Sequence, residues 1–211
     1  LTMFNDHDNI RQGDYKSRFC ADEEGARQVL NALALNVTTL GIPCIYYGTE
    51  QGFDGHGSDD RYIREAMFGG GFGAFCSKER HFFNEDTFVY RELAEILQIR
   101  KEKIPLRRGR QYLRPISGDG VNFGLPEMVG GRIHSIIPWS RVFSNKEILV
   151  LINTDYQNSK TAWVTVDNSL HRAGDRMRCI YSSQDKSRIG QEVTVEERNE
   201  KSVKITAPAC E

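Results

Sequence analysis

Residues Gly41–Gln51 read GIPCIYYGTEQ, in which an unbroken apolar run, Ile42–Tyr47, lies between two glycines. A short continuous run of this kind is typical of a parallel strand that is covered on both faces. Upstream of it, apolar residues recur at helical spacing over Ala26–Leu40, with Asp22 as the expected N-cap and Gly41 as the C-terminal stop. The pattern predicts a helix that ends at about Leu40 and leads directly into a strand.

The same alternation of strand and helix extends to both sides of this stretch. Met3-Phe4 has the composition of a strand end, and a second helical pattern covers Thr87–Lys103, with Asp86 as the expected cap and Pro105 as the end. An order of strand, helix, strand and helix is typical of a parallel α/β fold. We therefore predict that residues 1–108 form part of such a fold.

A different pattern begins near Gly109, where we place a domain boundary. The segments that follow are short, alternate apolar with polar residues, and are separated by turn-forming residues. This predicts an antiparallel β-sandwich over residues 109–211. Its expected strands are Ile133–Ile137, Ile148–Ile152, Ala162–Val166, Met177–Ile180, Glu192–Val195 and Val203–Ile205.

The composition limits the classes of partner. The 28 Lys and Arg residues nearly balance the 29 Asp and Glu residues, which argues against nucleic acid or an anionic membrane surface as a partner. No apolar run approaches the roughly 20 residues that a membrane-spanning helix needs. The chain starts at Leu1, without a methionine or a signal-peptide pattern, so we expect a preceding segment and infer no cellular location.

The five cysteines are odd in number and widely spaced, which predicts mostly reduced, structural thiols.

The most chemically active stretch is Phe4–Arg11, FNDHDNIR, in which two carboxylates flank His7 where an apolar strand ends. The second strand end carries Glu50 behind two tyrosines. Sites of α/β folds gather at the carboxyl ends of strands, and glycosidic cleavage requires an acid and a negative charge near the anomeric carbon. Three successive metal ligands in Asp6-His7-Asp8 are not expected, because adjacent strand residues point to opposite faces.

The pairing of FNDHDNIR with GIPCIYYGTEQGFDG resembles the last two strands of the (β/α)8 TIM barrel in the α-amylase family of glycoside hydrolases. Phe4, His7 and Asp8 match the end of the seventh strand, and Gly41–Gln51 match the eighth. Arg61–Met67 is similar to the loop that follows in the family, and the sandwich corresponds to the family's C-terminal β-domain. The resemblance therefore covers the whole chain.

The resemblance implies roles for individual residues. Asp8 takes the position of the carboxylate that stabilises the transition state, and His7 and Arg11 take positions that bind the substrate. The family's nucleophile and acid/base precede Leu1, and the resemblance gives Glu50 no catalytic role. Asp6 stands where the family usually has asparagine, which adds a negative charge beside the site.

The resemblance also implies an activity. We expect an enzyme that acts on α-glucans such as starch with retention, whose partners are the glucan and the remainder of the barrel. No cofactor is expected within this segment, and calcium only in the full-length enzyme. The alternatives are a glucan transglycosylase or isomerase of the same family, or a non-catalytic carbohydrate-binding or assembly module.

Overall fold

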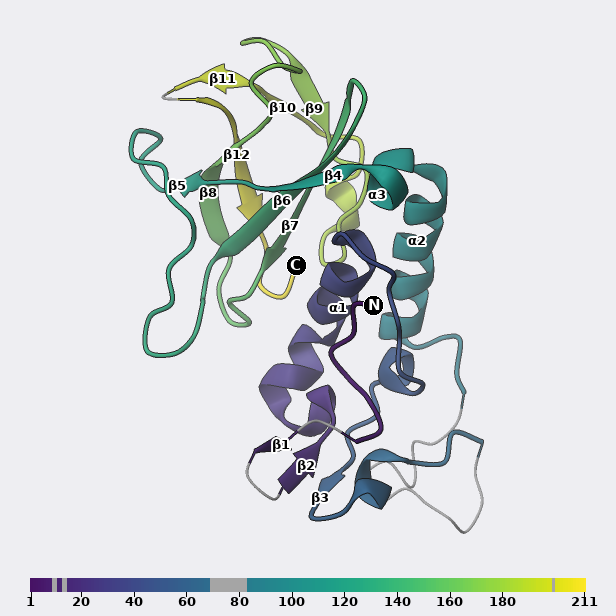
Figure 1. The fold of residues 1–211 in the computed structure, drawn as a ribbon. Coiled ribbons are helices and arrows are strands. Elements are labelled where there is room, and N and C mark those ends of the chain that lie inside the picture. The colour runs from purple at the N-terminus through teal and green to yellow at the C-terminus, as the bar shows by residue number, and fades with distance from the viewer. Residues whose placement is uncertain (9–10, 13–14, 69–82, 199) are drawn as a thin grey trace. The chain divides into compact units, whose positions relative to one another are not determined.

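The computed structural model of the chain describes residues 1–8, 11–12, 15–68, 83–198 and 200–211 (Figure 1). Two compact units are present. The first comprises residues 1–37 and 41–98, and the second comprises residues 38–40 and 99–211. The predicted domain boundary near Gly109 stays a prediction.

The first unit contains most of two helices and a small sheet. A three-stranded antiparallel sheet has the order β1-β2-β3. Helix α1 (Glu23–Thr38) lies between β2 and β3 in the sequence, and the 3-10 turn η1 (Phe19–Ala21) joins it to β2. The strands are β1 (Arg11–Gln12), β2 (Tyr15–Ser17) and β3 (His56–Gly57). Two further 3-10 turns are η2 (Thr49–Gln51) and η3 (Asp60–Ile63). The sequence pattern did not predict this sheet, because its strands are too short to carry a periodic signal.

The predicted N-cap of α1 is confirmed, and the helix ends earlier than expected. The side chain of Asp22 accepts a hydrogen bond of 2.7 Å from the backbone N–H of Gly25. The last helical residue is Thr38 rather than Leu40. Gly41 has a φ of 150°, and a Cβ there would lie 2.6 Å from Cγ2 of Thr2, so this position requires glycine.

The predicted strand over Ile42–Tyr47 is wrong as a regular strand. Within the described residues the segment makes one parallel bridge, between Thr2 and Pro43. Its hydrogen bonds run from Thr2 N to the Ile42 carbonyl (2.9 Å) and from Cys44 N to the Thr2 carbonyl (2.8 Å). The bonding is parallel, as predicted, but pairing at a single bridge does not make a ladder.

The second helical pattern forms two helices, α2 (Phe88–Glu102) and α3 (Ile104–Arg108). The predicted cap Asp86 is wrong: Thr87 directly precedes the helix and accepts a hydrogen bond from Tyr90 N through its Oγ1 (3.4 Å). Pro105 does end α2, but it also lies in the first turn of α3, where its missing N–H costs no hydrogen bond.

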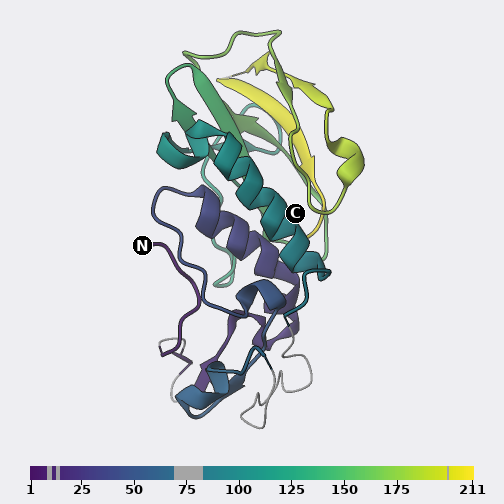
Figure 2. The same ribbon diagram turned by 90° about the vertical axis from the view of Figure 1, so that its right-hand side faces the viewer.

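The second unit is an antiparallel sandwich (Figures 1 and 2). One sheet has the order β4-β6-β7, the other the order β11-β12-β8-β5, and β10 pairs with β9. Five of the predicted strands correspond to β7 (Lys146–Asn153), β8 (Lys160–Thr165), β9 (Arg176–Arg178), β10 (Glu192–Thr194) and β12 (Lys201–Ala207). The predicted strand Ile133–Ile137 is wrong in its bounds, because β6 (Ile136–Phe143) shares only its last two residues. The strands that the pattern did not predict are β4 (Arg110–Leu113), β5 (Ile116–Ser117) and β11 (Glu196–Glu197).

The core of the sandwich lies between these sheets. Ile136 from β6 packs with Ala162 and Val164 from β8 and Ala207 from β12, with leucines of β7 against them. Burial of these side chains supplies the main stabilisation, about 25 cal/mol for each Å² of apolar surface removed from water. The sheets are therefore held together by side chains of alternate strand residues, as the sequence pattern indicated.

One charged side chain of the sandwich connects distant parts of the sequence. Arg141 on β6 is fully buried and donates to the carbonyl oxygens of Thr38 (2.7 Å) and Gly109 (2.8 Å). The N–H of Leu40 donates to Oε1 of Gln111 (2.5 Å). These bonds explain why residues 38–40 group with the second unit.

Candidate functional site

The stretch that carries His7 and Asp8 is held by a buried asparagine. Asn5 is 3% exposed, and its amide donates to Oγ1 of Thr49 (3.0 Å) and accepts from the N–H of Phe19 (3.0 Å). The ring of Phe4 packs edge-on against that of Phe19, with 5.2 Å between centroids. Asn5 thus fixes the backbone directly before the candidate site to η1 and η2.

His7 and Asp8 are both exposed, and a local turn presents them. The backbone N–H of Asp8 donates to Oδ1 of Asp6 at 2.7 Å, which is an Asx turn. Nε of Arg64 donates to the carbonyl oxygen of His7 at 3.0 Å. The family usually has asparagine at the position of Asp6. Asp6 accepts from the Asp8 N–H through a side-chain oxygen that an asparagine would also offer.

A group of four charged side chains surrounds this turn: Asp8, Lys16, Asp60 and Arg64, which we call the Lys16 cluster. Nζ of Lys16 lies 3.1 Å from Oδ1 of Asp8 and 3.0 Å from its carbonyl oxygen, and it also forms an ion pair with Asp60. Nη2 of Arg64 donates to Oδ2 of Asp60 at 2.9 Å. Lys16 comes from β2, and Asp60 and Arg64 come from η3 and its C-cap.

The cluster favours the ionised form of Asp8. The hydrogen bond from Lys16, followed by the positive charge of Lys16, lowers the pKa of the Asp8 carboxyl below its ordinary value. The Asp8 side chain is 62% exposed, whereas that of Lys16 is 10% exposed. Asp8 is therefore an ionised, accessible carboxylate, and the buried ammonium of Lys16 holds one of its oxygens.

A buried ion pair supports the loops behind this cluster. Nε of Arg18 lies 2.6 Å from Oε2 of Glu65, and both side chains are at most 1% exposed. The guanidinium stacks on the ring of Tyr46, 4.4 Å from its centroid, and on Tyr47 and Phe53 at 5.1 and 5.4 Å. Nη1 of Arg18 also donates to the Tyr47 carbonyl oxygen at 2.7 Å.

The two tyrosines hold the segment that carries Arg64 and Glu65. The hydroxyl of Tyr46 donates to the carbonyl oxygen of Ile63 (3.2 Å), and that of Tyr47 donates to the carbonyl oxygen of Glu65 (2.9 Å). Gly48 has a φ of 83°, and a Cβ there would lie 2.4 Å from the Phe53 ring. The YYG part of the resemblance is thus explained by packing. The Arg18–Glu65 pair was not predicted, because no local pattern marks a contact between residues so far apart in the sequence.

Two other candidates from the sequence are Arg11 and Glu50. Arg11 is in β1, with Lys16 as its register partner, and its side chain lies outside the described residues. Glu50 lies in η2, where burial raises the pKa of its carboxyl. Among the residues that the structure describes, no group of three His, Cys, Asp or Glu side chains is placed to hold a metal ion. No helix of the described chain is long and apolar enough to span a membrane.

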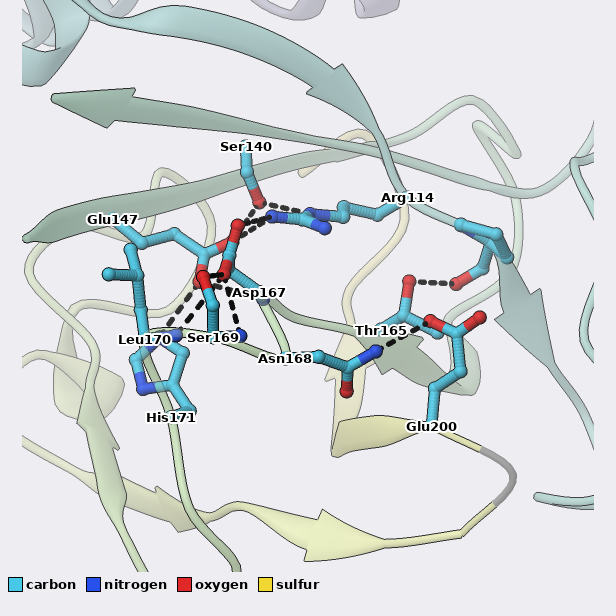
Figure 3. A network of polar contacts seen from close by, with 11 residues as sticks. Arg114, Ser140, Glu147, Thr165, Asp167, Asn168, Ser169, Leu170, His171 and Glu200 are labelled. Carbon is cyan, nitrogen blue, oxygen red and sulfur yellow. Dashed lines mark hydrogen bonds and ion pairs between the residues drawn. The ribbon is translucent and has the colours of Figure 1, made fainter. Parts of the chain in front are cut away.

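The sandwich contains a second polar cluster, around Glu147 (Figure 3). The Glu147 side chain is fully buried, and its Oε1 accepts from Nη2 of Arg114 (2.8 Å). Its Oε2 contacts His171 Nε2 (2.8 Å) and accepts from the backbone N–H of Asp167 (3.1 Å). Nε of Arg114 also donates to Oγ of Ser140 at 2.7 Å. Both carboxylate oxygens are occupied by groups of the chain itself, so this cluster stabilises the sandwich and offers no site.

Comparisons with known proteins agree with the resemblance. A cyclomaltodextrin glucanotransferase from Thermoanaerobacterium thermosulfurigenes is 29% identical over 133 residues, which are 63% of this chain and 14% of that protein. An α-amylase from Niallia circulans is 24% identical over 159 residues, 75% of this chain and 23% of that protein. No family model matches the chain.

The fold is also shared with a solved structure. The crystal structure of a γ-CGTase from alkalophilic Bacillus clarkii superposes with a TM-score of 0.57 at 19% identity, covering 92% of this chain and 24% of that chain. The chain thus spans about a quarter or less of the length of these three proteins. The resemblance to the C-terminal region of α-amylase family enzymes, predicted from the sequence, is confirmed.

Proposed function

We propose that this chain is the C-terminal part of an enzyme that cleaves or transfers α-glucans, and that residues 1–108 supply the last two strands and helices of its (β/α)8 barrel. The parallel bridge between Thr2 and Pro43 supports this arrangement, because it pairs the two segments that the resemblance assigns to neighbouring strands. The sandwich is then the family's C-terminal domain. The remainder of the barrel and the α-glucan are the proposed partners.

Asp8 is the proposed stabiliser of the transition state. The observation that carries the proposal is an ionised, exposed carboxylate next to His7, at the end of the segment that pairs with Pro43. Hydrogen bonds from sugar hydroxyls to such a carboxylate strengthen as the ring distorts and positive charge develops at the anomeric carbon. Arg11 and His7 are proposed to bind the same sugar. The nucleophile and the acid/base are proposed to precede Leu1.

The test compares Asp8→Asn with the exposed control Asp86→Asn in a protein that carries this chain together with its preceding barrel segment. We expect Asp8→Asn to lower kcat on starch about 100-fold or more while KM changes little, because the lost interaction acts mainly in the transition state. Asp86→Asn should leave both constants unchanged. Unaltered kcat in Asp8→Asn would refute the assignment.

A second measurement tests the division of the active site. The 211-residue chain alone, mixed with soluble starch, should release no reducing ends. Reducing-end release by the chain alone would show that its nucleophile is not upstream. Product analysis of the longer protein then distinguishes hydrolysis from glucan transfer, since linear and cyclic or transferred products separate by chromatography.

A further inference from the structure

We propose that Lys16 is a positioning residue for Asp8. Asp60 holds the ammonium of Lys16 in place, and Arg64 holds the backbone of His7. The inference rests on the proposed function, because it concerns how the Asp8 carboxylate is presented to a sugar. Lys16 itself is not expected to touch the substrate.

The contacts of Lys16 indicate a fixed ammonium rather than a mobile surface charge. An ammonium has three donors, and Nζ of Lys16 contacts three oxygens: Oδ1 of Asp8, the carbonyl oxygen of Asp8, and Oδ1 of Asp60. Its side chain is only 10% exposed. Contacts to both the side chain and the backbone of one residue restrict the rotation of that side chain about its own Cα.

The arrangement leaves one carboxylate oxygen of Asp8 for a ligand. Within the described part of the chain, Lys16 is bonded to Oδ1, and the carboxylate remains 62% exposed. Oδ2 is then the oxygen that can accept from a sugar hydroxyl. A carboxylate held in one orientation before the substrate binds does not have to reorganise during the reaction, which is where such groups contribute most.

Asp60 and Arg64 balance the charge of the cluster. Asp60 pairs with both Lys16 and Arg64, so Asp8 shares the ammonium with a second carboxylate instead of being neutralised by it. Arg64 also donates to the carbonyl oxygen of His7. The two candidate residues His7 and Asp8 are therefore held from the same loop, one through its backbone and one through Lys16.

The experiment uses Lys16→Met, which keeps an apolar stem, and Lys16→Arg, which keeps the charge. In the longer protein, Lys16→Met should lower kcat about 10- to 100-fold with KM within about threefold, and Lys16→Arg should recover part of the loss. The exposed lysine variant Lys101→Met is the matched control and should leave both constants unchanged. Wild-type kcat in Lys16→Met, with Asp8→Asn inactive, would overturn the positioning role and leave the proposed function intact.

A readout that does not depend on turnover separates the two proposals. The carboxyl carbon of Asp8, followed by NMR during an acid titration of the 211-residue chain, should titrate at higher pH in Lys16→Met, because its cationic partner is gone. Asp60→Asn should shift it the opposite way, since Asp8 then no longer shares the ammonium. An unchanged Asp8 titration in both variants would refute the Lys16 contact itself, whatever the activity. Asp60→Asn also keeps the proposal testable if Lys16→Met does not fold.

Discussion

Arg18 is a cation that the fold removes almost completely from water. It has one carboxylate partner, Glu65, one carbonyl acceptor on Tyr47, and three aromatic rings around its guanidinium. Arginine suits this place better than lysine, because its planar group stacks on aromatic faces and is weakly hydrated. The pair fixes the relation between β2 and the segment that carries Arg64.

Glu65→Gln should lower the free energy of unfolding by about 3 to 5 kcal/mol, since it leaves a buried guanidinium without its counter-charge. Urea unfolding of the 211-residue chain followed by circular dichroism measures the loss. The control is Glu23→Gln on α1, whose carboxylate is 85% exposed and lies 4.0 Å from Arg27, so its removal should cost no more than about 0.5 kcal/mol. Equal, small effects of the two substitutions would contradict the importance of the buried pair.

The residues of the candidate site differ in how well the sequence predicted them. His7 and Asp8 were found through their motif, because a short segment of chain carries both. Lys16 and Asp60 gave no signal of their own, since their role depends on a contact between β2 and η3 that no local pattern records. The inward direction of Lys16 follows from strand alternation with the exposed Tyr15, but β2 itself was not predicted.

The two predicted N-caps differ in outcome. Asp22 was correctly predicted as a cap, and its carboxylate accepts from Gly25 N. Asp86 is also an aspartate that comes shortly before a helix, but Thr87 lies between it and Phe88. The hydroxyl of Thr87 accepts from Tyr90 N instead. Composition alone does not distinguish two adjacent residues that are both suited to the N-cap position.

Asp22→Ala should destabilise the chain by about 1 kcal/mol, because the N–H of Gly25 loses its acceptor. Asp86→Ala should change stability by less than about 0.5 kcal/mol, and it is the matched control because it removes the same group one residue outside a helix cap. Thermal unfolding by calorimetry measures both. Equal losses in the two variants would show that α2 begins earlier than the structure indicates.

Strands with a long alternating pattern were predicted from the sequence, and some short strands were not. The strands β7, β8 and β12 were predicted because alternation over several residues marks a sheet with one buried face. For β6 only the first two residues lay in the predicted strand. β4 and β5 were not, because their pairing with β6 and β8 is a property of the assembled sandwich. The segment Ile42–Tyr47 has the composition of a buried strand, but a regular parallel ladder requires more pairing than the bridge to Thr2 provides.

Across the whole second unit, hydrogen-bonded aspartates couple stability to pH. Burial raises the pKa of Asp155, but hydrogen bonds from Gln157 N and Asn158 and the ion pair with Lys160 outweigh it, so that the pKa is lowered. A lowered pKa contributes stability above the unfolded value of about 3.9. This contribution is lost as the pH falls through the folded value.

Asp155→Asn should therefore destabilise the chain at pH 7, by about 1.5 kcal/mol, and the difference from the unsubstituted chain should shrink steadily below about pH 4. Urea unfolding at a series of pH values measures this difference. Glu127→Gln, an exposed carboxyl of the same unit, should show no such trend. A difference that stays constant down to pH 2 would contradict the assigned direction of the pKa shift.

The short segment of residues 38–40 has a consequence for recombination between related genes. Arg141 takes one of its carbonyl acceptors from Thr38 and the other from Gly109, on opposite sides of most of the first unit in sequence. A crossover that transplants residues 99–211 into a related gene places Arg141 against the end of α1 of the recipient protein. The sandwich is therefore not an exchangeable cassette with a single seam, because a chimera has to keep the end of α1 where Arg141 reaches the Thr38 carbonyl oxygen.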